Sequence, residues 1–334
     1  MHLRSGRTTI GRTFLGCVLI AAALAASPVH AQSATKIRRI GVLDGGAPPT
    51  AEERQAALGP LRELGWVEGR NLVIDERYAN GDEARLPALA QELVALKVEL
   101  IVSNGTAAAL AAKAATRSIP IVMFAAGDPV RSRIVQSLAR PAGNITGYAV
   151  VAEEIERKRA ALLRELLPAA QVVGVLIDPS YPLSPLLRQE IDRAYRSLGV
   201  RPVFVEVAAP DQIRRAVEGL SRQKADALVV TRTTLFTDHR AIVMTAALDH
   251  ALPTIVQGED ELEAGGLVSY SISFGEQYVR GAAFVDRILR GAKPGDLPIE
   301  QPTRFELGVN VKTAKALNVK IPQALLLRAD RVIQ

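Results

Sequence analysis

Apolar runs and amphipathic stretches alternate along the chain from residue 38 onward. Runs rich in β-branched residues indicate strands, and the first half of the chain has four of them: residues 38–46, 72–79, 98–105 and 119–127. Apolar side chains at helical spacing fill the gaps between these runs: residues 51–64, 83–96 and 106–117. Asp82 suits the N-cap of the second helical stretch. Strands that alternate with helices of this length predict a parallel sheet covered by helices on both faces.

The same alternation begins again in the second half of the chain. A helix is expected at residues 153–167, and four strands follow: residues 171–178, 201–208, 225–232 and 252–258. Further helical stretches lie between these strands: residues 183–198, 212–221 and 238–251. The predicted fold class is therefore α/β, with two Rossmann-like lobes that each contain a parallel sheet.

The second half continues beyond what a short α/β lobe needs. An extended segment at 265–273 is followed by a helix at 276–290 and by a further extended segment. One interpretation is that the chain passes back to the first lobe and returns, which gives three hinge strands near 143–150, 267–274 and 297–306. The other is a helix packed on the second lobe alone. We favour the hinged arrangement, with lobes comprising 36–145 plus 272–296 and 146–271 plus 297–334.

The first 31 residues have the pattern of a secretory signal peptide. Arg4, Arg7 and Arg12 precede an apolar run at 14–26, and Val29-His30-Ala31 fits a small-residue cleavage site. The alternative, a membrane anchor, requires about 20 apolar residues, and this run has 13. A lipid-modified cysteine would follow the apolar run, whereas Cys17 lies ahead of most of it. We therefore expect cleavage after Ala31 and export across one membrane.

Composition narrows the chemistry of the exported chain. It would contain no cysteine, which excludes disulfides and thiolate chemistry, and its only histidines would be His239 and His250. Loss of the leader lowers the formal net charge from +6 to +3, and no basic cluster alternates with aromatic residues, so nucleic acid is not an expected partner. The sequence contains no G-x-G-x-x-G after the first strand, no G-x-S-x-G and no H-x-x-x-H. We predict no catalytic residue, no cofactor and no metal.

Several motifs, taken in order, resemble those of a known family. They are "RELGWVEGRNLVIDERYANGD", "LPALAQELVALKVELIVSNGTAAALAAKAAT", "IPIVMFAAGDPV", "SLARPAGNITG", "EAGGLVSY" and "GAKPGDLPIEQPTRFELGVNVKTAKALNVKIP". As a set running from Arg38 to Asp330, they resemble the ABC-transporter substrate-binding proteins of the tryptophan/tyrosine-binding type. The resemblance implies a type I periplasmic binding protein fold: two lobes, three hinge crossings and a ligand held between the lobes.

Two stretches depart from the pattern of that family. Ser269-Tyr270-Ser271 stands where "SYG" is usual, and "TRTTLFTDHR" at 231–240 stands where a "DP-FF-RR"-like stretch is usual. Both fall where ligand contacts are expected. The fold expectation is unaffected, whereas the identity of the ligand is left open.

Turns after the strands of the first lobe supply candidate ligand-binding residues. Ligands of open parallel sheets bind outside the carboxyl ends of the strands, and a helix N-terminus there can hold a carboxylate without a basic side chain. Two sets of residues meet this condition: the turn Ser103, Asn104, Gly105 and Thr106, and the acids Asp44 and Asp128. The alternatives are a plain helix cap for the turn, a turn role for Asp44 and a cap for Asp128 ahead of a helix beginning at Pro129.

The second lobe should supply the opposing side of the site. Asp178, Thr233 and Glu259 each follow a predicted strand, and an acid among Asp178, Glu259 and Asp260 could bind an ammonium group. The alternative for each acid is a solvated loop charge, and Arg232 suits either a carboxylate clamp or the surface.

Tyr148 and Tyr270 fall in the proposed hinge strands. A ring at either position could stack on an aromatic ligand or a cation. The alternative is packing between the hinge strands.

The function predicted by this resemblance is solute capture. The lobes would close on a small amino-acid-like solute, with an aromatic amino acid favoured, and deliver it to the membrane permease subunits of an ABC importer. We expect a periplasmic monomer without enzymatic activity. The alternatives are a periplasmic sensory subunit that presents the bound solute to a membrane receptor, which would have the same sequence pattern, and an exported enzyme.

Overall fold

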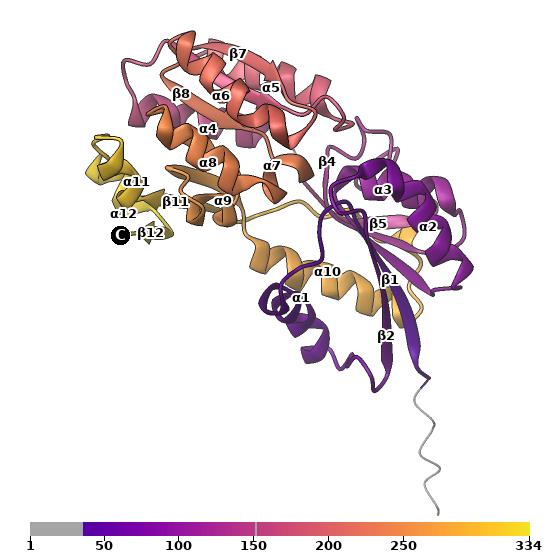
Figure 1. Ribbon diagram of the computed structural model, residues 1–334. Coiled ribbons are helices and arrows are strands. Elements are labelled where there is room, and N and C mark those ends of the chain that lie inside the picture. Colours follow the sequence, from indigo (N-terminus) through magenta and orange to yellow (C-terminus); the bar gives the residue numbers. More distant parts are fainter. Residues whose placement is uncertain (1–35, 151) are drawn as a thin grey trace, which may run out of the picture. The chain divides into compact units, whose positions relative to one another are not determined.

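Two β-sheets flanked by helices make up the described part of the chain (Figure 1). The structure is a computed structural model and describes residues 36–150 and 152–334. Both sheets belong to one compact unit, Ile37–Gln334. The predicted signal peptide at 1–31 lies outside the described residues.

The first sheet is fully parallel, with the strand order β2-β1-β3-β4-β5. Its strands are β1 (Arg38–Asp44), β2 (Leu72–Tyr78), β3 (Leu100–Asn104), β4 (Ile121–Gly127) and β5 (Ile145–Val150). Its sequence-adjacent helices are α1 (Ala51–Glu63), the 3₁₀ turn η1 (Glu83–Arg85), α2 (Leu86–Ala95) and α3 (Gly105–Ala115). α2 and α3 share one apolar cluster, which includes Leu93 of α2. A Cβ on Gly41 of β1 would lie 2.9 Å from Cδ2 of Leu93, so the helix packs closely on the sheet. The predicted order of elements in the first half is confirmed.

The second sheet has the order β12-β11-β10-β9-β8-β6-β7 and is parallel except for the antiparallel pair β10–β11. Its strands are β6 (Val172–Ile177), β7 (Arg201–Glu206), β8 (Ala227–Val230), β9 (Thr254–Val256), β10 (Val268–Ile272), β11 (Phe305–Asn310) and β12 (Arg331–Ile333). Its helices are α4 (Ala152–Leu166), α5 (Ser184–Arg196), η2 (Pro210–Gln212), α6 (Ile213–Arg222), α7 (Thr234–Asp238), α8 (Arg240–Asp249), α9 (Glu259–Glu263), α11 (Val311–Ala316) and α12 (Gln323–Arg328). α4 and α5 share one apolar cluster with the sheet, and α6 and α8 share another, so two helix layers enclose the strands. The predicted α/β class with two largely parallel sheets is confirmed.

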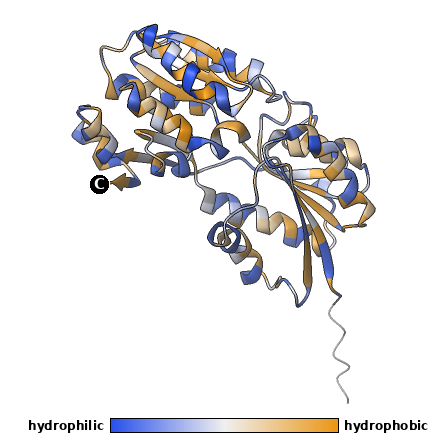
Figure 2. Ribbon diagram, viewed as in Figure 1, coloured by the Kyte–Doolittle hydropathy of each residue, from blue (hydrophilic) through white to orange (hydrophobic). Residues whose placement is uncertain are grey.

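Hydropathy follows this layering (Figure 2). The strands are mostly hydrophobic, and α6 buries Ile213, Val217 and Leu220 while its other face is hydrophilic. No helix among the described residues is both long and apolar enough to span a bilayer.

The helix α10 (Phe274–Leu289) follows β10 of the second sheet but packs on the first. It contacts β3, β4, β5 and α1, and a Cβ on Gly281 would meet the Phe124 ring of β4 at 2.0 Å. Asp286 of α10 accepts a hydrogen bond from the Trp66 indole nitrogen at 2.8 Å. The chain therefore passes between the sheets three times: after β5, after β10 and ahead of β11.

The lobe boundaries predicted at 145/146 and 296/297 differ from the structure, although the crossings lie at or within the predicted hinge segments. All of β5 pairs with β4, so residues 146–150 belong to the first lobe rather than the second. The segment after η3 (Pro294–Asp296) also stays with the first sheet, because Glu300 exchanges hydrogen bonds with Gly147 and Ala149. The crossings therefore fall after Val150 and after Glu300.

One local prediction was wrong. The helix expected from Pro129 is a series of turns, and Asp128 has a φ of 41° and donates its backbone N–H to Val150. A left-handed φ cannot start a helix, so Asp128 is not an N-cap there. The helix expected at 238–251 is α8 (Arg240–Asp249), and the one-turn α7 (Thr234–Asp238) ahead of it was not predicted.

Candidate functional site

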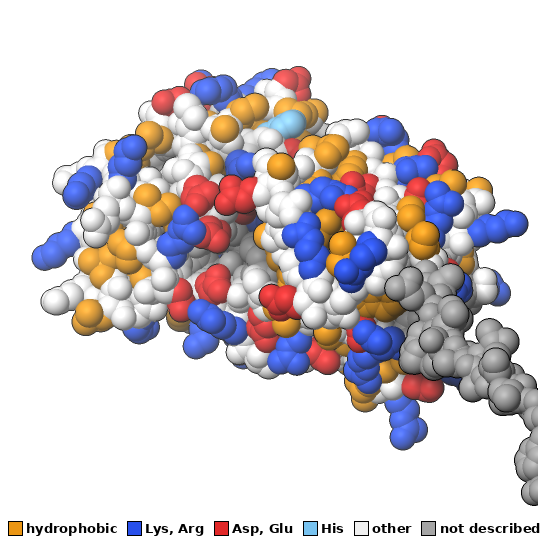
Figure 3. All heavy atoms as spheres, turned by 90° about the horizontal axis from the view of Figure 1, so that it is seen from below, with side chains coloured by type: hydrophobic (Ala, Val, Ile, Leu, Met, Phe, Trp, Pro, Cys, Tyr) orange, Lys and Arg blue, Asp and Glu red, His pale blue; other side chains and the backbone are white. Residues whose placement is uncertain are grey.

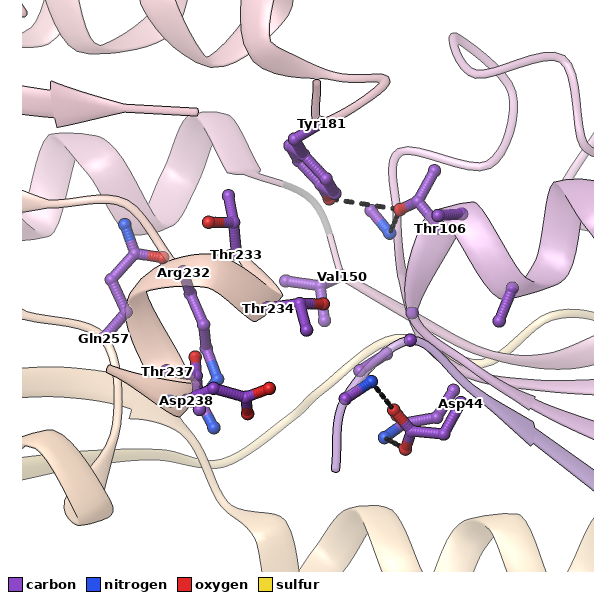
Figure 4. A pocket seen from close by; sticks show the side chains of 18 of the residues that line it. Asp44, Thr106, Val150, Tyr181, Arg232, Thr233, Thr234, Thr237, Asp238 and Gln257 are labelled. Carbon is purple, nitrogen blue, oxygen red and sulfur yellow. Dashed lines mark hydrogen bonds between the residues drawn. The ribbon is translucent and has the colours of Figure 1, made fainter. Parts of the chain in front are cut away.

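A cleft of about 580 Å³ is lined by residues of both sheets. Its lining includes the loop after β1, the start of α3, the loop that contains Tyr181 and the segment from Arg232 to Arg240. The carboxyl ends of parallel strands meet there, as in other open α/β sheets. Its volume lies within the range of small-molecule sites, about 300–1,000 Å³. Figure 4 shows these side chains facing a shared space.

The N-terminus of α3 forms one part of the wall. Gly105 has a φ of 79°, a conformation that favours glycine, and it lets the chain turn directly from β3 into the helix. Asn104 is the N-cap but makes no side-chain cap bond, because its amide donates to the Asp44 carboxylate at 2.7 Å. The first backbone N–H groups of α3 therefore lack a side-chain cap at a wall of the cleft, where they suit an anionic group.

Thr106 joins this helix end to the other sheet. Its Oγ1 accepts a hydrogen bond from the Gly127 N–H at 2.9 Å and lies 3.1 Å from the Tyr181 hydroxyl (Figure 4). Burial raises the pKa of Tyr181, so the phenol stays protonated and can donate this bond. A hydroxyl from the second lobe thus closes one edge of the cleft.

Three carboxylates of the lining surround Gly45-Gly46: Asp44, Glu83 and Asp238. A Cβ on Gly46 would lie 3.4 Å from an Asp44 oxygen and 3.6 Å from an Asp238 oxygen. Asp44 accepts from the Gly46 N–H at 2.8 Å, and Glu83 accepts from the Thr234 hydroxyl at 3.3 Å. We call Asp44, Glu83 and Asp238 the acidic cluster.

Burial raises the pKa of each member of the acidic cluster. The charge of Asp44 raises the pKa of Asp238 further, and the charge of Asp178 does the same for Glu83. Carboxylates that lie close together in a partly desolvated site repel one another, which favours the protonated form of each carboxyl group. Figure 3 shows acidic side chains around the hollow in this face of the molecule.

The second sheet contributes basic groups that are already bound to acids. Arg159 pairs with Glu156 at 2.5 Å and donates two bonds to the Tyr270 carbonyl, at 3.0 and 2.7 Å. Arg232 pairs with Asp260 at 3.0 Å and with Glu261 at 3.3 Å. These ion pairs shape the wall while their charges largely cancel.

Two buried oxygens in this wall have no hydrogen-bond partner among the described residues. They are Oγ1 of Thr233, which is 4% exposed, and Oε2 of Glu156, which is 1% exposed. A buried polar atom without a partner is costly, so both suit a group brought by a ligand. Apolar lining comes from Val150, Ile155, Leu183, Leu187 and Ile272.

Five of the residues predicted from the sequence line the cleft: Asp44, Asn104, Gly105, Thr106 and Thr233. Ser103 does not, because side chains alternate between the two faces of β3 and its own is fully buried in the interior. The lining also includes Arg232 and Asp260, which the sequence left open.

The two tyrosines of the proposed hinge strands lie outside the lining. Tyr148 is fully buried in a small cluster with Ile155 and Ile272. Tyr270 stacks on Phe305 of the neighbouring strand, with ring centroids 5.7 Å apart. Both tyrosines therefore pack between strands, which is the alternative interpretation given for them above.

Three predicted acids are also outside the lining and engaged elsewhere. Asp128 lies 3.8 Å from Arg131, and Asp178 accepts from the Ser180 N–H and hydroxyl at 2.9 and 2.6 Å. Glu259 forms an ion pair with Arg331. Each therefore has a structural partner of its own.

Sequence reasoning missed Glu83 and Asp238 as members of the site. Glu83 lies in the first turn of η1, where acids are common for helix-dipole reasons alone, and Asp238 ends the one-turn α7, which the sequence did not predict. Glu83 reaches Gly45 within the first lobe, whereas Asp238 reaches Gly46 only where the two lobes meet. Among residues 36–150 and 152–334, no group of three His, Cys, Asp or Glu side chains is arranged to hold a metal ion.

Comparisons with known proteins agree on the family to which this chain is similar. The sequence model of the family described as "ABC transporter substrate binding protein" matches residues 47–333. A "Tyrosine-binding protein" of Clostridioides difficile (strain R20291) is 26% identical over 276 residues, which cover 82% of this chain and 78% of that protein.

Solved structures agree with the family match. An ABC domain from Streptococcus pneumonia, solved in complex with L-Trp, is 25% identical, with a TM-score of 0.83 over 89% of this chain and 100% of that chain. The leucine-binding protein LivK of Thermotoga maritima is 16% identical and shares the fold, with a TM-score of 0.56 over 77% of each chain. This chain therefore belongs to the family of ABC transporter substrate-binding proteins and has the type I periplasmic binding protein fold.

Proposed function

We propose that this protein is the solute-capturing component of an ABC importer. It binds a small amino-acid-like solute in the cleft, closes on it and delivers it to the membrane permease. The leader at 1–31 would export the chain to the periplasm, where the solute is met. An aromatic amino acid is the first candidate, because the relatives include a tyrosine-binding protein and a structure with bound tryptophan.

The observation that carries this proposal is a cleft lined from both sheets. Asp44 and Thr106 come from the first lobe, whereas Tyr181, Thr234 and Asp238 come from the second. A ligand that contacts both lobes favours the closed arrangement by the difference in its affinity for the closed and open states. The three segments that connect the sheets, near Val150, near Ser273 and at 301–304, would act as the hinges.

The wall has complementary groups for an amino acid. The uncapped start of α3 suits the carboxylate, and the acidic cluster suits the ammonium group. Tyr181, Tyr278 and the neighbouring apolar side chains suit an uncharged side chain. This division places the two charged ends of a zwitterion on different elements.

Binding can be tested on the mature chain, residues 32–334. We expect at least one amino acid, tested by thermal shift and then by calorimetry, to bind one to one. A solute at 100 times its Kd should stabilise the protein by about 2.7 kcal/mol. If no amino acid or related amine shifts the melting temperature or gives heat of binding, the proposed function fails.

Delivery to a permease needs a separate test. Deleting this chain from the organism that produces it should lower uptake of the radiolabelled solute, and restoring the wild-type chain should restore uptake. If binding is intact but uptake is unchanged and a receptor domain binds the loaded protein instead, the sensory alternative replaces the importer role.

A further inference from the structure

Two buried side chains on the second-lobe wall of the cleft have unused hydrogen-bonding capacity. Oε1 of Glu156 accepts from the Arg159 guanidinium at 2.5 Å and from the Gln257 amide at 3.4 Å, whereas its Oε2 has no partner in the described part of the chain. The Thr233 hydroxyl has none there either. Both residues line the cleft, so a ligand bound in it can supply the missing bonds. We call Glu156 and Thr233 the polar pair.

A series of contacts joins the two members of the polar pair. Gln257, which donates to Glu156, has its backbone N–H bound to the Glu261 carboxylate at 3.0 Å. Glu261 also pairs with Arg232 at 3.3 Å, and Arg232 directly precedes Thr233. Figure 4 shows Thr233 and Gln257 on the same side of the cleft. The two unpartnered oxygens therefore belong to one part of the wall.

The polar pair differs from the acidic cluster in its charge. Glu156 is paired with Arg159, which is fixed by two bonds to the Tyr270 carbonyl, so the local charges cancel. An ionised carboxylate can only accept, so Oε2 requires a donor, whereas the Thr233 hydroxyl can donate or accept. A phenol satisfies both, because its O–H donates and its oxygen accepts. A carboxylate of the solute would leave Oε2 without a donor and bring a further negative charge beside it.

Apolar side chains border the polar pair. Ile155 precedes Glu156 in α4 and shares an apolar cluster with Ile272 of β10, and both isoleucines line the cleft. Thr106, at the start of α3, lies across the space from Thr233 in Figure 4. A solute whose carboxylate is held at α3 can therefore extend its side chain to this wall. A ring with a hydrogen-bond donor at its edge matches such a mixed surface.

We propose that Glu156 and Thr233 determine specificity by binding a hydrogen-bond donor on the side chain of the solute. The ligand class is an aromatic amino acid with an O–H or N–H group on its ring, rather than one with a hydrocarbon ring. This inference rests on the proposed function, solute capture in the cleft, and adds the group that the second lobe recognises.

Amino acids that differ in the donor on the ring test this inference. Calorimetry on the mature wild-type chain at pH 7.5 would compare L-tyrosine, L-tryptophan, L-phenylalanine and 4-fluoro-L-phenylalanine, which has nearly the size of tyrosine and no donor. We expect the tighter of tyrosine and tryptophan to bind about tenfold more tightly, or more, than either phenylalanine. A ring without a donor leaves buried polar groups of the site without a partner.

The outcomes separate this inference from the function on which it rests. If either phenylalanine binds as tightly as the tighter of tyrosine and tryptophan, the inference is overturned while solute capture stands. If none of the four binds but another amino acid does, the inference is overturned in the same way. If no amino acid binds at all, solute capture itself fails.

Thr233→Val tests the polar pair with little disturbance of the fold, because it keeps the shape of the side chain and removes a hydroxyl that has no partner within the described residues. The unliganded variant should keep its melting temperature. The ratio of the Kd for phenylalanine to the Kd for the tighter donor-bearing solute should fall by about threefold or more. Ser103→Ala is the matched control, since it also removes a buried hydroxyl without a described partner but lies outside the lining, and it should leave the ratio unchanged.

Glu156→Gln tests the other member. Its carbonyl can still accept from Arg159, whereas an amide nitrogen can replace the unpartnered oxygen, and the same ratio should fall by about tenfold or more. If this variant does not fold because Arg159 has lost its charged partner, Thr233→Val alone decides. A wild-type ratio in Thr233→Val, or in folded Glu156→Gln, would overturn the inference.

Discussion

The hydroxyl of Tyr181 lies 3.1 Å from Oγ1 of Thr106, and the two residues belong to different lobes. The turn from Ser103 to Thr106 has the pattern of a ligand-holding loop, yet part of its hydrogen-bonding capacity is used by the protein itself. A second contact between the lobes joins Arg131, in the turns after β4, to Glu190 of α5 at 2.9 Å. These contacts stabilise the arrangement in which the cleft is formed.

Tyr181→Phe should therefore weaken solute binding. The substitution keeps the ring and removes one hydrogen bond between the lobes, worth about 0.5–1.5 kcal/mol, or roughly a two- to tenfold rise in Kd. Calorimetry on the wild type and the variant measures this change. Thr106→Ser keeps the hydroxyl and is the matched control, with an expected change of less than twofold. Equal Kd values for wild type and Tyr181→Phe would show that this contact has no role in closure.

Gly281→Ala should destabilise the protein because α10 packs closely on the first sheet. A Cβ at this position would meet the Phe124 ring at 2.0 Å, so the helix or the ring must shift. Overpacking of this kind costs roughly 1–3 kcal/mol. Gly275→Ala in the same helix meets no atom closer than 3.9 Å and should be neutral or stabilising by up to about 1 kcal/mol. Urea denaturation measures both, and equal stabilities would argue against the packing of α10 described above.

Stability should rise as the pH falls from 8 to 5, in part through Glu261. Burial raises the pKa of this carboxyl to about 7, although Arg232 and Arg159 lower it and Asp260 raises it. Because the folded pKa lies above the unfolded one, the folded state binds the proton more tightly, and the free energy of unfolding increases on acidification through the folded pKa. The contribution is roughly 2–3 kcal/mol between pH 8 and pH 5.

Glu261→Gln isolates this contribution. The variant should lose much of the increase in unfolding free energy between pH 8 and pH 5, measured by urea denaturation at each pH. Arg232 keeps its ion pair with Asp260, so the variant retains one partner for the guanidinium. A variant with the same pH dependence as the wild type would place the pKa of Glu261 near its ordinary value.

Solute affinity should show the opposite dependence on pH. The pKa values of Asp44, Glu83 and Asp238 are raised by burial, so these groups take up protons at a higher pH than ordinary carboxyls. Protonation removes the charge that attracts a cationic nitrogen, and the Kd of an amine should increase as the pH falls from 7.5 to 5. Calorimetry across this range measures the change. A Kd that stays constant or decreases on acidification would show that the cluster does not bind the amine as carboxylates.

The alternation of strands and helices was enough to predict both sheets, because a parallel sheet buries continuous apolar runs such as "LIV" at 100–102. Local features governed by tertiary contacts were not predictable. Asp128 adopts a left-handed backbone because its N–H reaches Val150, and no pattern near Pro129 reveals this partner. The crossing after Glu300 depends in the same way on pairing with Gly147.

The candidate site was predictable only in part, for a related reason. Asp44, Asn104 and Thr106 follow strands whose carboxyl ends meet at one edge of the first sheet, so topology alone brings them together. Glu83 reaches this place through backbone hydrogen bonds of Asn80 and Gly81 to Gly46 and Gly45, which no local pattern reveals. Asp238 reaches it only when the second lobe faces the first. Arg159 and Glu156 lie within a helix whose pattern resembles that of any charged amphipathic helix.

Capture of a solute between the two lobes can be seen directly in a crystal structure of the mature chain with its bound solute. We expect electron density for the solute in the cleft between the two sheets, with its nitrogen within hydrogen-bonding distance of Asp44 or Asp238. Contacts from both lobes should also be present, including the segment that contains Tyr181. A solute bound outside this cleft, or held by one lobe alone, would rule out capture between the lobes.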